Sequence, residues 1–179
     1  MDYVLSFDDL SIRFGDVEAT KQISFAVRKG EVVAVVGESG SGKSVTAMSA
    51  LGLLPRQAEV TGTIKLEDHE IRQLPRKELR ALRGNEIAMI FQEPMTALSP
   101  VHTIGWQVAE AVKLHQAVPD VHKKVVELLT TVGLDRPEQR AKQYPHELSG
   151  GMRQRVMIAM AISCDPKVII ADEPTTALD

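Results

Sequence analysis

The sequence predicts an α/β protein built around a parallel sheet that leads into a phosphate-binding loop. Two runs of mainly branched apolar residues, 32–36 and 167–171, are typical of strands buried on both faces of such a sheet. The first run continues into the glycine-rich loop 37–44, and the second ends in two carboxylates. Much of the chain between residues 104 and 162 has the apolar spacing of helices.

The N-terminal third is predicted to be rich in strands. Residues 23–28 alternate apolar and polar side chains with a period of two and end in a turn at Lys29-Gly30. Residues 60–66 have the composition of a further strand. The helix after the glycine-rich loop is expected to run from Ser44 to Leu54, and a short charged helix is expected over residues 74–82, entered through Pro75.

The second half is predicted to hold one more buried strand, at residues 87–91, followed by a helical insert. Helical periodicity covers residues 104–116, 121–132 and 151–162, and prolines mark the connections between these segments. Strand-rich material therefore flanks a helical subdomain.

Bulk properties count against several functional classes. The chain has 179 residues, 44% of them hydrophobic and 25% charged, as in a soluble globular protein. Its net charge of -3 argues against a broad nucleic-acid surface, which needs clustered lysine and arginine. The single cysteine, Cys164, cannot form an internal disulfide. No run of apolar residues is long enough to span a membrane.

The loop 37–44 has the chemistry of a phosphate site. Gly37 and Gly42 let the backbone wrap around phosphates, while successive N–H groups and the positive end of the following helix form an anion cradle. Lys43 supplies a charge for the β- and γ-phosphates, and the Ser44 hydroxyl can ligate Mg²⁺. The loop residues predicted to bind ATP are Gly37, Glu38, Ser39, Gly40, Ser41, Gly42, Lys43, Ser44 and Val45.

Two further segments become candidate parts of the same site because the chain also contains this loop. Asp172 and Glu173 close a strand, where one carboxylate can enter a Mg²⁺ shell and the other can polarise the attacking water. In isolation they would be an ordinary acidic turn. Residues 148–152 place Ser149, Gly150 and Gly151 at the start of an apolar helix, which is either a second phosphate-binding helix end or a simple N-cap.

Taken in order, these motifs resemble those of the ATP-binding cassette (ABC) ATPases, and the resemblance covers essentially the whole chain. Residues 148–155 resemble the signature motif of that family, and residues 168–175 its Walker B segment. Residues 177–179 resemble the D-loop, and Gln92 the Q-loop. The resemblance implies a P-loop NTPase core with a parallel sheet, an N-terminal antiparallel β subdomain and a helical insert, truncated at the C-terminus.

The resemblance also implies a division of the chain and further roles. The ATP-binding core with its β subdomain would span 1–91, the helical subdomain 92–163, and the returning Walker B strand with the D-loop 164–179. Phe14 would stack on adenine, although a strand-end phenylalanine can equally be a core residue. The implied catalytic residues are Glu173, Gln92 and Lys43, and the implied Mg²⁺ ligands are Ser44, Gln92 and Asp172.

Partners follow from the same resemblance. Ser149, Gly150 and Gly151 would contact the γ-phosphate of ATP held by a second cassette, so dimerisation, with an identical or a different cassette, would be part of the mechanism. Residues 37–47, 87–100 and 144–147 resemble ATPase subunits of dipeptide, oligopeptide, glutathione or nickel importers. Such a subunit would lie peripherally at the cytoplasmic face of the membrane, contact transmembrane permease subunits, and depend indirectly on a substrate-binding protein.

Two other classes of function remain possible at this point. A soluble ABC-type ATPase would act without transport, and a nucleotide-binding module would have no catalysis of its own. An importer-like segment after Gln92 counts against the first, and an intact Glu173 against the second. Since the chain stops at Asp179, before a switch histidine that the family carries, we also expect this chain alone to hydrolyse ATP poorly. Turnover by this chain equal to that of a longer parent chain would contradict that expectation.

Several residues are interpreted as structural. His102, His115 and His122 lack metal-ligand spacing with cysteines, and Cys164 is expected to be a small core residue. A charged helix face is predicted for Arg76, Lys77, Glu78, Arg80 and Arg83. Three apolar residues suit either the core of the helical insert or a surface facing the membrane subunits: Met95, Leu98 and Trp106.

Overall fold

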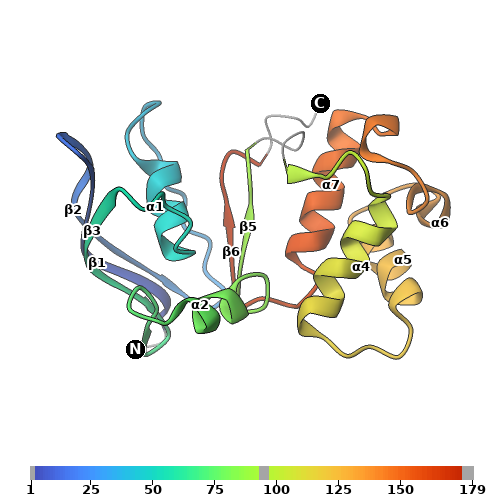
Figure 1. Ribbon diagram of the computed structural model, residues 1–179, viewed down its shortest axis with the longest axis horizontal. Helices are drawn as coiled ribbons and strands as arrows, with labels where there is room; N and C mark the ends of the chain where they lie inside the picture. Colours follow the sequence, from blue (N-terminus) through green and yellow to red (C-terminus); the bar gives the residue numbers. More distant parts are fainter. Residues whose placement is uncertain (1–2, 93–96, 175–179) are drawn as a thin grey trace. The chain divides into compact units, whose positions relative to one another are not determined.

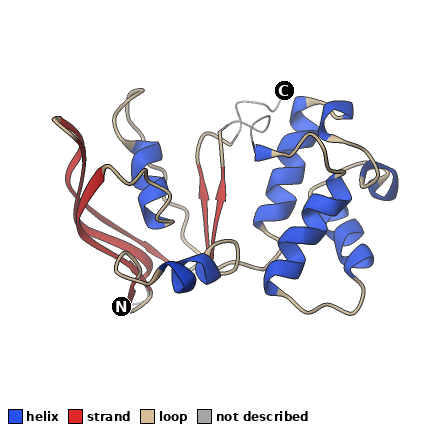
Figure 2. Cartoon of the chain, viewed as in Figure 1, coloured by secondary structure: helices blue, strands red, loops and turns tan. Residues whose placement is uncertain are grey.

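The computed structural model describes residues 3–92 and 97–174, which form two compact units, 1–83 and 84–179 (Figures 1 and 2). The unit boundary assigns the strand at residues 87–90 to the second unit, together with the helices from residue 104 onward. The three-part division at 91/92 and 163/164 stays a prediction.

A four-stranded antiparallel sheet dominates the first unit, with the order β2-β1-β3-β4. Its strands are β1 (Tyr3–Phe14), β2 (Val17–Arg28), β3 (Ala58–Leu66) and β4 (His69–Glu70). Alternation of apolar and polar residues gives the sheet one buried face, on which Leu10, Ile12 and Ile64 are completely inaccessible to solvent. The strands predicted at 23–28 and 60–66 are therefore confirmed, although β2 begins six residues earlier.

Gly62 is required where β3 passes a bulge in β1. The register between these strands shifts between Asp8 and Ser11, and Gly62 has a φ of 86°. A Cβ at Gly62 would lie 2.5 Å from the Asp9 carbonyl oxygen and 2.6 Å from that of Asp8. Only glycine allows the two backbones to approach so closely.

We therefore expect Gly62→Ala to lower the free energy of unfolding by about 2–4 kcal/mol, the sum of a left-handed backbone and a steric clash. Gly15→Ala is the matched control, because Gly15 also has a positive φ of 56° but a Cβ there would meet no atom within 4 Å. That control should cost only about 1 kcal/mol. Urea unfolding measures both, and equal losses would contradict the role of the clash.

Helix α1 (Lys43–Ala50) follows the glycine-rich loop and ends four residues before the predicted Leu54. Gly52, at a φ of 58°, turns the chain away from the helix. Arg83, 31 residues further along the chain than Gly52, binds the C-terminal end of this helix. Its Nε donates to the Leu51 carbonyl at 2.7 Å and its Nη2 to the Gly52 carbonyl at 2.9 Å. The helix is shorter than predicted because Gly52 reverses the chain there, and Arg83 satisfies the carbonyl of the C-cap residue Leu51.

Helix α2 (Arg76–Leu82) begins after Pro75, as predicted, and buries none of its residues. Arg83, directly after it, differs from the predicted solvated face, because it is half-buried and bound to the end of α1. Burial lowers the pKa of Arg83, and the positive charges of Arg76 and Arg80 lower it further.

One predicted strand is wrong. Residues 31–38 form no regular secondary structure, and the side chains of Val32 and Val36 are 96% and 88% exposed. A branched apolar run is buried as a central strand only when neighbouring strands pair with both of its edges. No strand of the described residues pairs with this segment, so the run stays open to solvent.

The second unit contains a two-stranded parallel sheet of β5 (Ile87–Ile90) and β6 (Val168–Ala171). Residues 87 to 90 pair in order with residues 168 to 171, and the Asp172 N–H extends the ladder to the Ile90 carbonyl at 2.9 Å. The prediction that both strands are buried is largely right for β5. It is wrong for β6, where Ile169 is 45% exposed because no described strand covers that side.

The helices of this unit are α4 (Ile104–His115), α5 (Val121–Thr131), α6 (Pro137–Arg140) and α7 (Gly150–Ala161), with a 3₁₀ turn at Pro145–Glu147. The three long helices match their predicted ranges within a residue or so. Thr103, Asp120 and Ser149 cap their N-termini by accepting backbone N–H groups. Helices α4, α5 and α7 pack on one another around a shared apolar core.

The structure gives the burial of several residues that were interpreted as structural. Cys164 is buried at 7% exposure, as predicted. Leu98 lies in the core at 4% exposure, whereas Trp106 is 47% exposed and stacks on His102. Met95 lies outside the described residues. Within the part of the chain that is described, no helix combines the length and apolar character needed to cross a bilayer.

Candidate functional site

Lys43 closes the glycine-rich loop from inside. Its Nζ donates to the carbonyl oxygens of Gly37 and Glu38, both at 2.7 Å, and lies 3.5 Å from the Ser41 hydroxyl. The Ser41 N–H returns to the Glu38 carbonyl at 3.2 Å, which makes a tight turn. The positive charge of Lys43 is therefore held at the centre of the loop, where a bound phosphate would need it.

The spacing of the glycines has a steric reason. A Cβ at Gly37 would lie 2.6 Å from the Ser41 hydroxyl oxygen. Gly42, at a φ of 90°, is pressed against β2, because a Cβ there would lie 2.5 Å from both the Ala19 carbonyl oxygen and the Thr20 side chain. The loop can keep this compact curve only without a side chain at 42, while a side chain at 37 would displace the Ser41 hydroxyl; both features fit a cradle that encloses phosphate.

The N-terminus of α1 differs from the other long helix starts. Gly42 occupies the N-cap position, no side chain caps the helix, and its first turn has no acidic residue. The helices α4, α5 and α7, by contrast, each have a side-chain cap. The first N–H groups of α1 and the half-buried Ser44 hydroxyl thus remain available for an anion that is not part of the described protein.

Phe14 lies in the same unit as this loop. It is half-buried at the end of β1, where it pairs with Val17 of β2 and with Ala58 of β3. The loop touches β2 at Ala19 and Thr20, two and three residues from Val17. At the usual rise of a strand this separation is roughly 7–10 Å, which an adenosine can bridge. Partial burial leaves part of the ring accessible for stacking.

Gln92 and Glu173, which are 81 residues apart in the chain, meet in the second unit. The Gln92 side-chain Nε2 donates to Oε2 of Glu173 at 2.6 Å, and both residues are exposed. They meet because β5 and β6 are parallel neighbours, so that the segments after Ile90 and after Ala171 leave the same end of the sheet. The structure thus brings together the predicted Q-loop glutamine and the predicted water-activating carboxylate.

Glu173 has an unusual backbone. Its φ of 46° lies in the left-handed region, which a residue with a side chain rarely adopts. Such a conformation costs about 1–3 kcal/mol and persists only where neighbouring contacts impose it. Asp172, one residue earlier, is still held by the β5–β6 ladder and is half-buried.

The signature segment begins α7. The Ser149 hydroxyl accepts the Met152 N–H at 3.3 Å, so the N-cap interpretation of this serine is confirmed. Gly150 and Gly151 form the first turn of the helix. Before it, the Glu147 carboxylate accepts the Tyr144 N–H at 2.7 Å, and Arg153 Nε donates to the Pro145 carbonyl at 2.7 Å. These bonds hold the 144–149 connection against the helix that it starts.

One residue of the signature-like segment 148–155 was given no role of its own by the sequence, and it lies close to Glu173. Gln154, on α7, is 1% exposed and donates through its Nε2 to the Pro174 carbonyl at 2.8 Å. Its side-chain oxygen is buried and has no hydrogen-bond partner among residues 3–92 and 97–174. A glutamine within a mostly apolar helix was the available signal, but its partner comes from a distant segment that helical periodicity cannot reveal.

The predicted Mg²⁺ ligands lie in both units, with Ser44 in the first and Gln92 and Asp172 in the second. All three offer oxygen atoms, the donors that Mg²⁺ prefers, and Mg²⁺ commonly takes most of its other ligands from phosphates and water. Among residues 3–92 and 97–174, no group of three or more histidine, cysteine or acidic side chains could hold a metal by itself. Each of these side chains, taken within its own unit, therefore offers a donor that suits Mg²⁺. The D-loop residues 177–179 lie outside the described residues.

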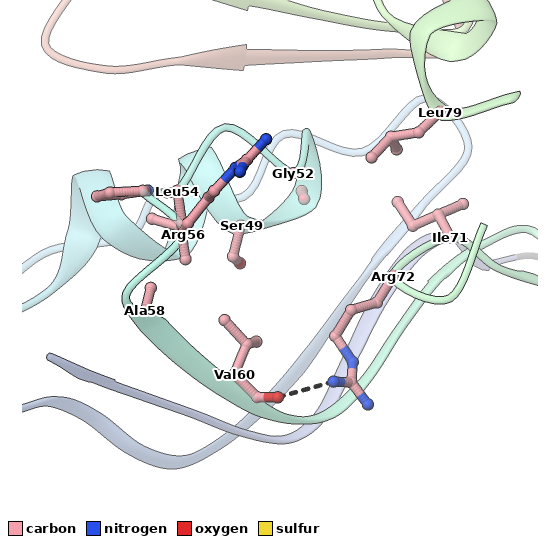
Figure 3. Close-up of a pocket in the computed structure, with 11 residues that line it drawn as sticks. Ser49, Gly52, Leu54, Arg56, Ala58, Val60, Ile71, Arg72 and Leu79 are labelled. Atoms are coloured by element: carbon pink, nitrogen blue, oxygen red, sulfur yellow. Dashed lines mark hydrogen bonds between the residues drawn. The ribbon is translucent and has the colours of Figure 1, made fainter. Parts of the chain in front are cut away.

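A surface pocket of the first unit lies at the other end of α1 (Figure 3). Ser49, Gly52, Arg56 and Leu79 are among its lining residues, and Arg72 donates to the Val60 carbonyl at its edge. An eight-residue helix is about 12 Å long, so this pocket is a separate feature from the loop at the N-terminus of α1. It contains none of the predicted site residues.

Comparison with known proteins adds three kinds of finding. The family model described as ABC transporter matches residues 20–176. The "Peptidoglycan transport ATP-binding protein YejF" of Agrobacterium fabrum is 55% identical over 98% of this chain and 34% of its own length. The "Dipeptide transport ATP-binding protein DppD" of Bacillus subtilis is 50% identical over 100% of this chain and 56% of its own length. The chain thus spans between a third and a little over half of these curated relatives.

A solved structure is similar across nearly the whole chain. It is a dimeric ATP-binding cassette in a post-hydrolysis state, bound to ADP and Pi. The match has a TM-score of 0.84 and 28% sequence identity, and it covers 98% of this chain and 76% of that one. The mixed α/β fold with an antiparallel N-terminal sheet and a parallel sheet is therefore confirmed.

Proposed function

Because this chain belongs to the ABC transporter family, we propose that it is the ATP-binding and ATP-hydrolysing part of a subunit that energises an importer. The observation that carries the proposal is the loop 37–44, with Lys43 held at its centre and an uncapped helix start behind it. Compact backbone, a central cation and free helical N–H groups are together the features that bind the phosphates of a nucleotide.

In this proposal the first unit binds ATP. The N–H groups of residues 37–45 surround the phosphates, Lys43 pairs with the β- and γ-phosphates, and Phe14 stacks on the adenine. The contact of Gly42 with β2 supports the last assignment, since it fixes the loop against the strand that pairs with Phe14.

Glu173 and Gln92 supply the hydrolytic chemistry. The Glu173 carboxylate takes a proton from water while the water oxygen forms a bond to the γ-phosphorus. The bond from that phosphorus to the β–γ bridging oxygen breaks, and its electron pair leaves with ADP, so that the products are ADP, inorganic phosphate and a proton. Gln92 orients the carboxylate, as their 2.6 Å contact supports, and Lys43 stabilises charge on the phosphate oxygens.

Mg²⁺, when bound with ATP, would neutralise part of the negative charge of the phosphate groups. Ser44, Gln92 and Asp172 are the residues that would hold it. Their oxygen donors fit this role, and Asp172 is kept in place by the bond from its N–H to the Ile90 carbonyl.

A second cassette is the first proposed partner. Ser149, Gly150 and Gly151 at the start of α7 would contact the γ-phosphate of ATP held by that cassette, so each nucleotide would lie between two chains. The dimeric state of the similar cassette described above supports this arrangement. The serine would keep its N-cap bond and use its remaining hydrogen-bonding capacity for the phosphate.

Transmembrane permease subunits are the second proposed partner, at the cytoplasmic face of the membrane, and peptides are the proposed cargo class. The names of the two relatives, peptidoglycan and dipeptide transport proteins, support the cargo class. Trp106 supports the permease contact, because it is one of the residues that suit a surface facing the membrane subunits and its side chain is 47% exposed.

We expect Trp106→Glu to reduce co-purification of the chain with polytopic membrane proteins from detergent-solubilised membranes, because a charge would interrupt an apolar contact. His122→Glu is the matched control: His122 is an exposed ring-bearing residue on α5 of the same unit, outside the helix that carries Trp106. Mass spectrometry identifies the partners. Recovery of no polytopic protein with the unmodified chain would favour a soluble ATPase instead.

A further inference from the structure

We propose that Gln154 is a positioning residue for ATP hydrolysis. Its buried amide holds the backbone of Glu173 in the conformation from which the carboxylate acts, and it joins the signature helix to that carboxylate. The inference rests on the proposed function, in which Glu173 activates water, and adds a residue that touches neither ATP nor water.

The first support is the hydrogen bond itself. Gln154 Nε2 donates at 2.8 Å to the carbonyl oxygen of Pro174, the residue directly after Glu173. The Gln154 side chain is 1% exposed, so water cannot replace this bond if it breaks. The bond therefore holds the chain next to Glu173 firmly against α7.

The second support is the backbone of Glu173. The parallel ladder ends with the bond from the Asp172 N–H to the Ile90 carbonyl, and Glu173 then adopts a φ of 46°. A non-glycine residue keeps a left-handed conformation only when its surroundings impose it. The Asp172 bond on one side and the Gln154 bond on the other fix the two neighbours of Glu173 and thus its backbone.

The third support is the side-chain contact that this backbone permits. Oε2 of Glu173 accepts from Gln92 Nε2 at 2.6 Å. Gln92 follows β5, whereas Gln154 belongs to α7, so two different elements set the backbone and the side chain of one residue. If the Pro174 carbonyl were released, Glu173 could relax toward an ordinary φ and its carboxylate would turn away from Gln92.

The chemistry of Gln154 also favours a role beyond packing. Its side-chain oxygen is buried and finds no hydrogen-bond partner in the described part of the chain, which is unfavourable for folding. An apolar residue of similar size would avoid that cost. Within the described residues, only the N–H group of the Gln154 amide forms a bond, and this bond holds the Pro174 carbonyl. That contact explains the amide better than a contribution to folding stability does.

The position of Gln154 links two parts of the proposed mechanism. Ser149 caps the same helix, and Gln154 lies five residues later, or about 7.5 Å along the helix axis. The helix packs against β5, whose end leads to Gln92. A shift of Ser149 would thus be transmitted along the first turns of α7 to Gln154, and from there through its hydrogen bond to the Pro174 carbonyl.

The test compares Gln154→Met with Gln107→Met. Gln107 is a matched control in the same unit: it is 5% exposed and also donates to backbone carbonyls, those of Ser99 and His102, both at 3.0 Å. Under single-turnover conditions we expect Gln154→Met to slow hydrolysis about 10- to 100-fold, the usual effect of a small misplacement of a reacting group. ATP affinity should be unchanged, and Gln107→Met should alter neither quantity.

A second measurement does not depend on turnover. The side-chain amide resonance of Gln92, followed by ¹⁵N NMR without nucleotide, reports its bond to Glu173. It should move in Gln154→Met in the same direction as in Glu173→Ala, and it should stay in place in Gln107→Met. If Gln154→Met does not fold, Gln154→Asn replaces it in both measurements. Asparagine keeps the amide, but its side chain is one methylene group shorter, so the amide cannot reach the Pro174 carbonyl.

The outcomes separate the inference from the proposed function. Hydrolysis that survives Glu173→Gln would overturn both the role of Glu173 and that of Gln154. If Glu173→Gln is inactive while Gln154→Met keeps the normal rate and the normal Gln92 resonance, the positioning role alone is wrong. If both methionine variants hydrolyse ATP more slowly and also bind it more weakly, the substitutions destabilise the fold in general. That result would also contradict the positioning role of Gln154.

Discussion

Replacing Glu173 with glutamine should reduce ATP hydrolysis about 10²- to 10⁴-fold, the usual contribution of a general base, and leave ATP binding intact. The substitution keeps the size of the side chain and removes its ability to accept a proton from water. Glutamine can still hydrogen-bond to Gln92, which now contacts Oε2 of Glu173 at 2.6 Å, so the local geometry should survive. Single-turnover release of phosphate from labelled ATP, with protein in excess, measures the effect.

Glu127→Gln is the control for this experiment. Glu127 is an exposed glutamate on α5 of the same unit, so its replacement makes the same change of charge away from Gln92 and Asp172. It should leave the rate of hydrolysis unchanged. If Glu173→Gln retained the normal rate, another group would have to activate the water, and the chain would then fit a nucleotide-binding module better than an ATPase of this kind.

Replacing Lys43 with alanine should weaken ATP binding about 10- to 150-fold, because each charged hydrogen bond of this type contributes about 1.5–3 kcal/mol. In the structure the Lys43 amine bonds to the Gly37 and Glu38 carbonyls, which keeps it at the centre of the loop. The variant loses the positive charge and also the group that closes the loop. Titration with a fluorescent ATP analogue measures the affinity.

Lys21→Ala provides the comparison. Lys21 belongs to the same unit, and its side chain is 72% exposed. Its Nζ lies 3.9 Å from Oε2 of Glu18, which is a long distance for an ion pair. Exposed pairs of this length contribute little to stability, so the variant should fold and bind ATP normally. An equal loss of affinity in both variants would show that net charge, and not the position of Lys43, controls nucleotide binding.

Local sequence signals were sufficient for much of the fold and of the candidate site. Apolar spacing located α4, α5 and α7, because helical periodicity and capping are short-range properties. The glycine spacing of the loop was also informative, since Gly37 and Gly42 are positions where a Cβ would collide with nearby atoms. The meeting of Gln92 and Glu173 needed one further inference, that two separate apolar runs are parallel neighbours.

Non-local contacts account for what the sequence did not reveal. Whether residues 32–36 form a buried strand depends on other strands at their edges, and no property of the run itself can supply these. The end of α1 depends on Arg83, whose bond to the Leu51 carbonyl joins residues 32 positions apart. Gln154 has a normal place in helix α7, and its significance comes only from Pro174, 20 residues away.

The exposed run at 32–36 has a consequence for how the isolated chain behaves in solution. Its five residues are apolar and uncharged, four of them are valine, and Val32 and Val36 are almost fully open to water. Segments with strong β-propensity, no charge and no proline are the kind that join identical segments of other molecules into cross-β stacks. Glu31 and Glu38 flank the run, and their repulsion between copies opposes this self-association. The colloidal stability of the chain therefore depends on these two carboxylates, and it declines in acidic or high-salt solutions that neutralise or screen them.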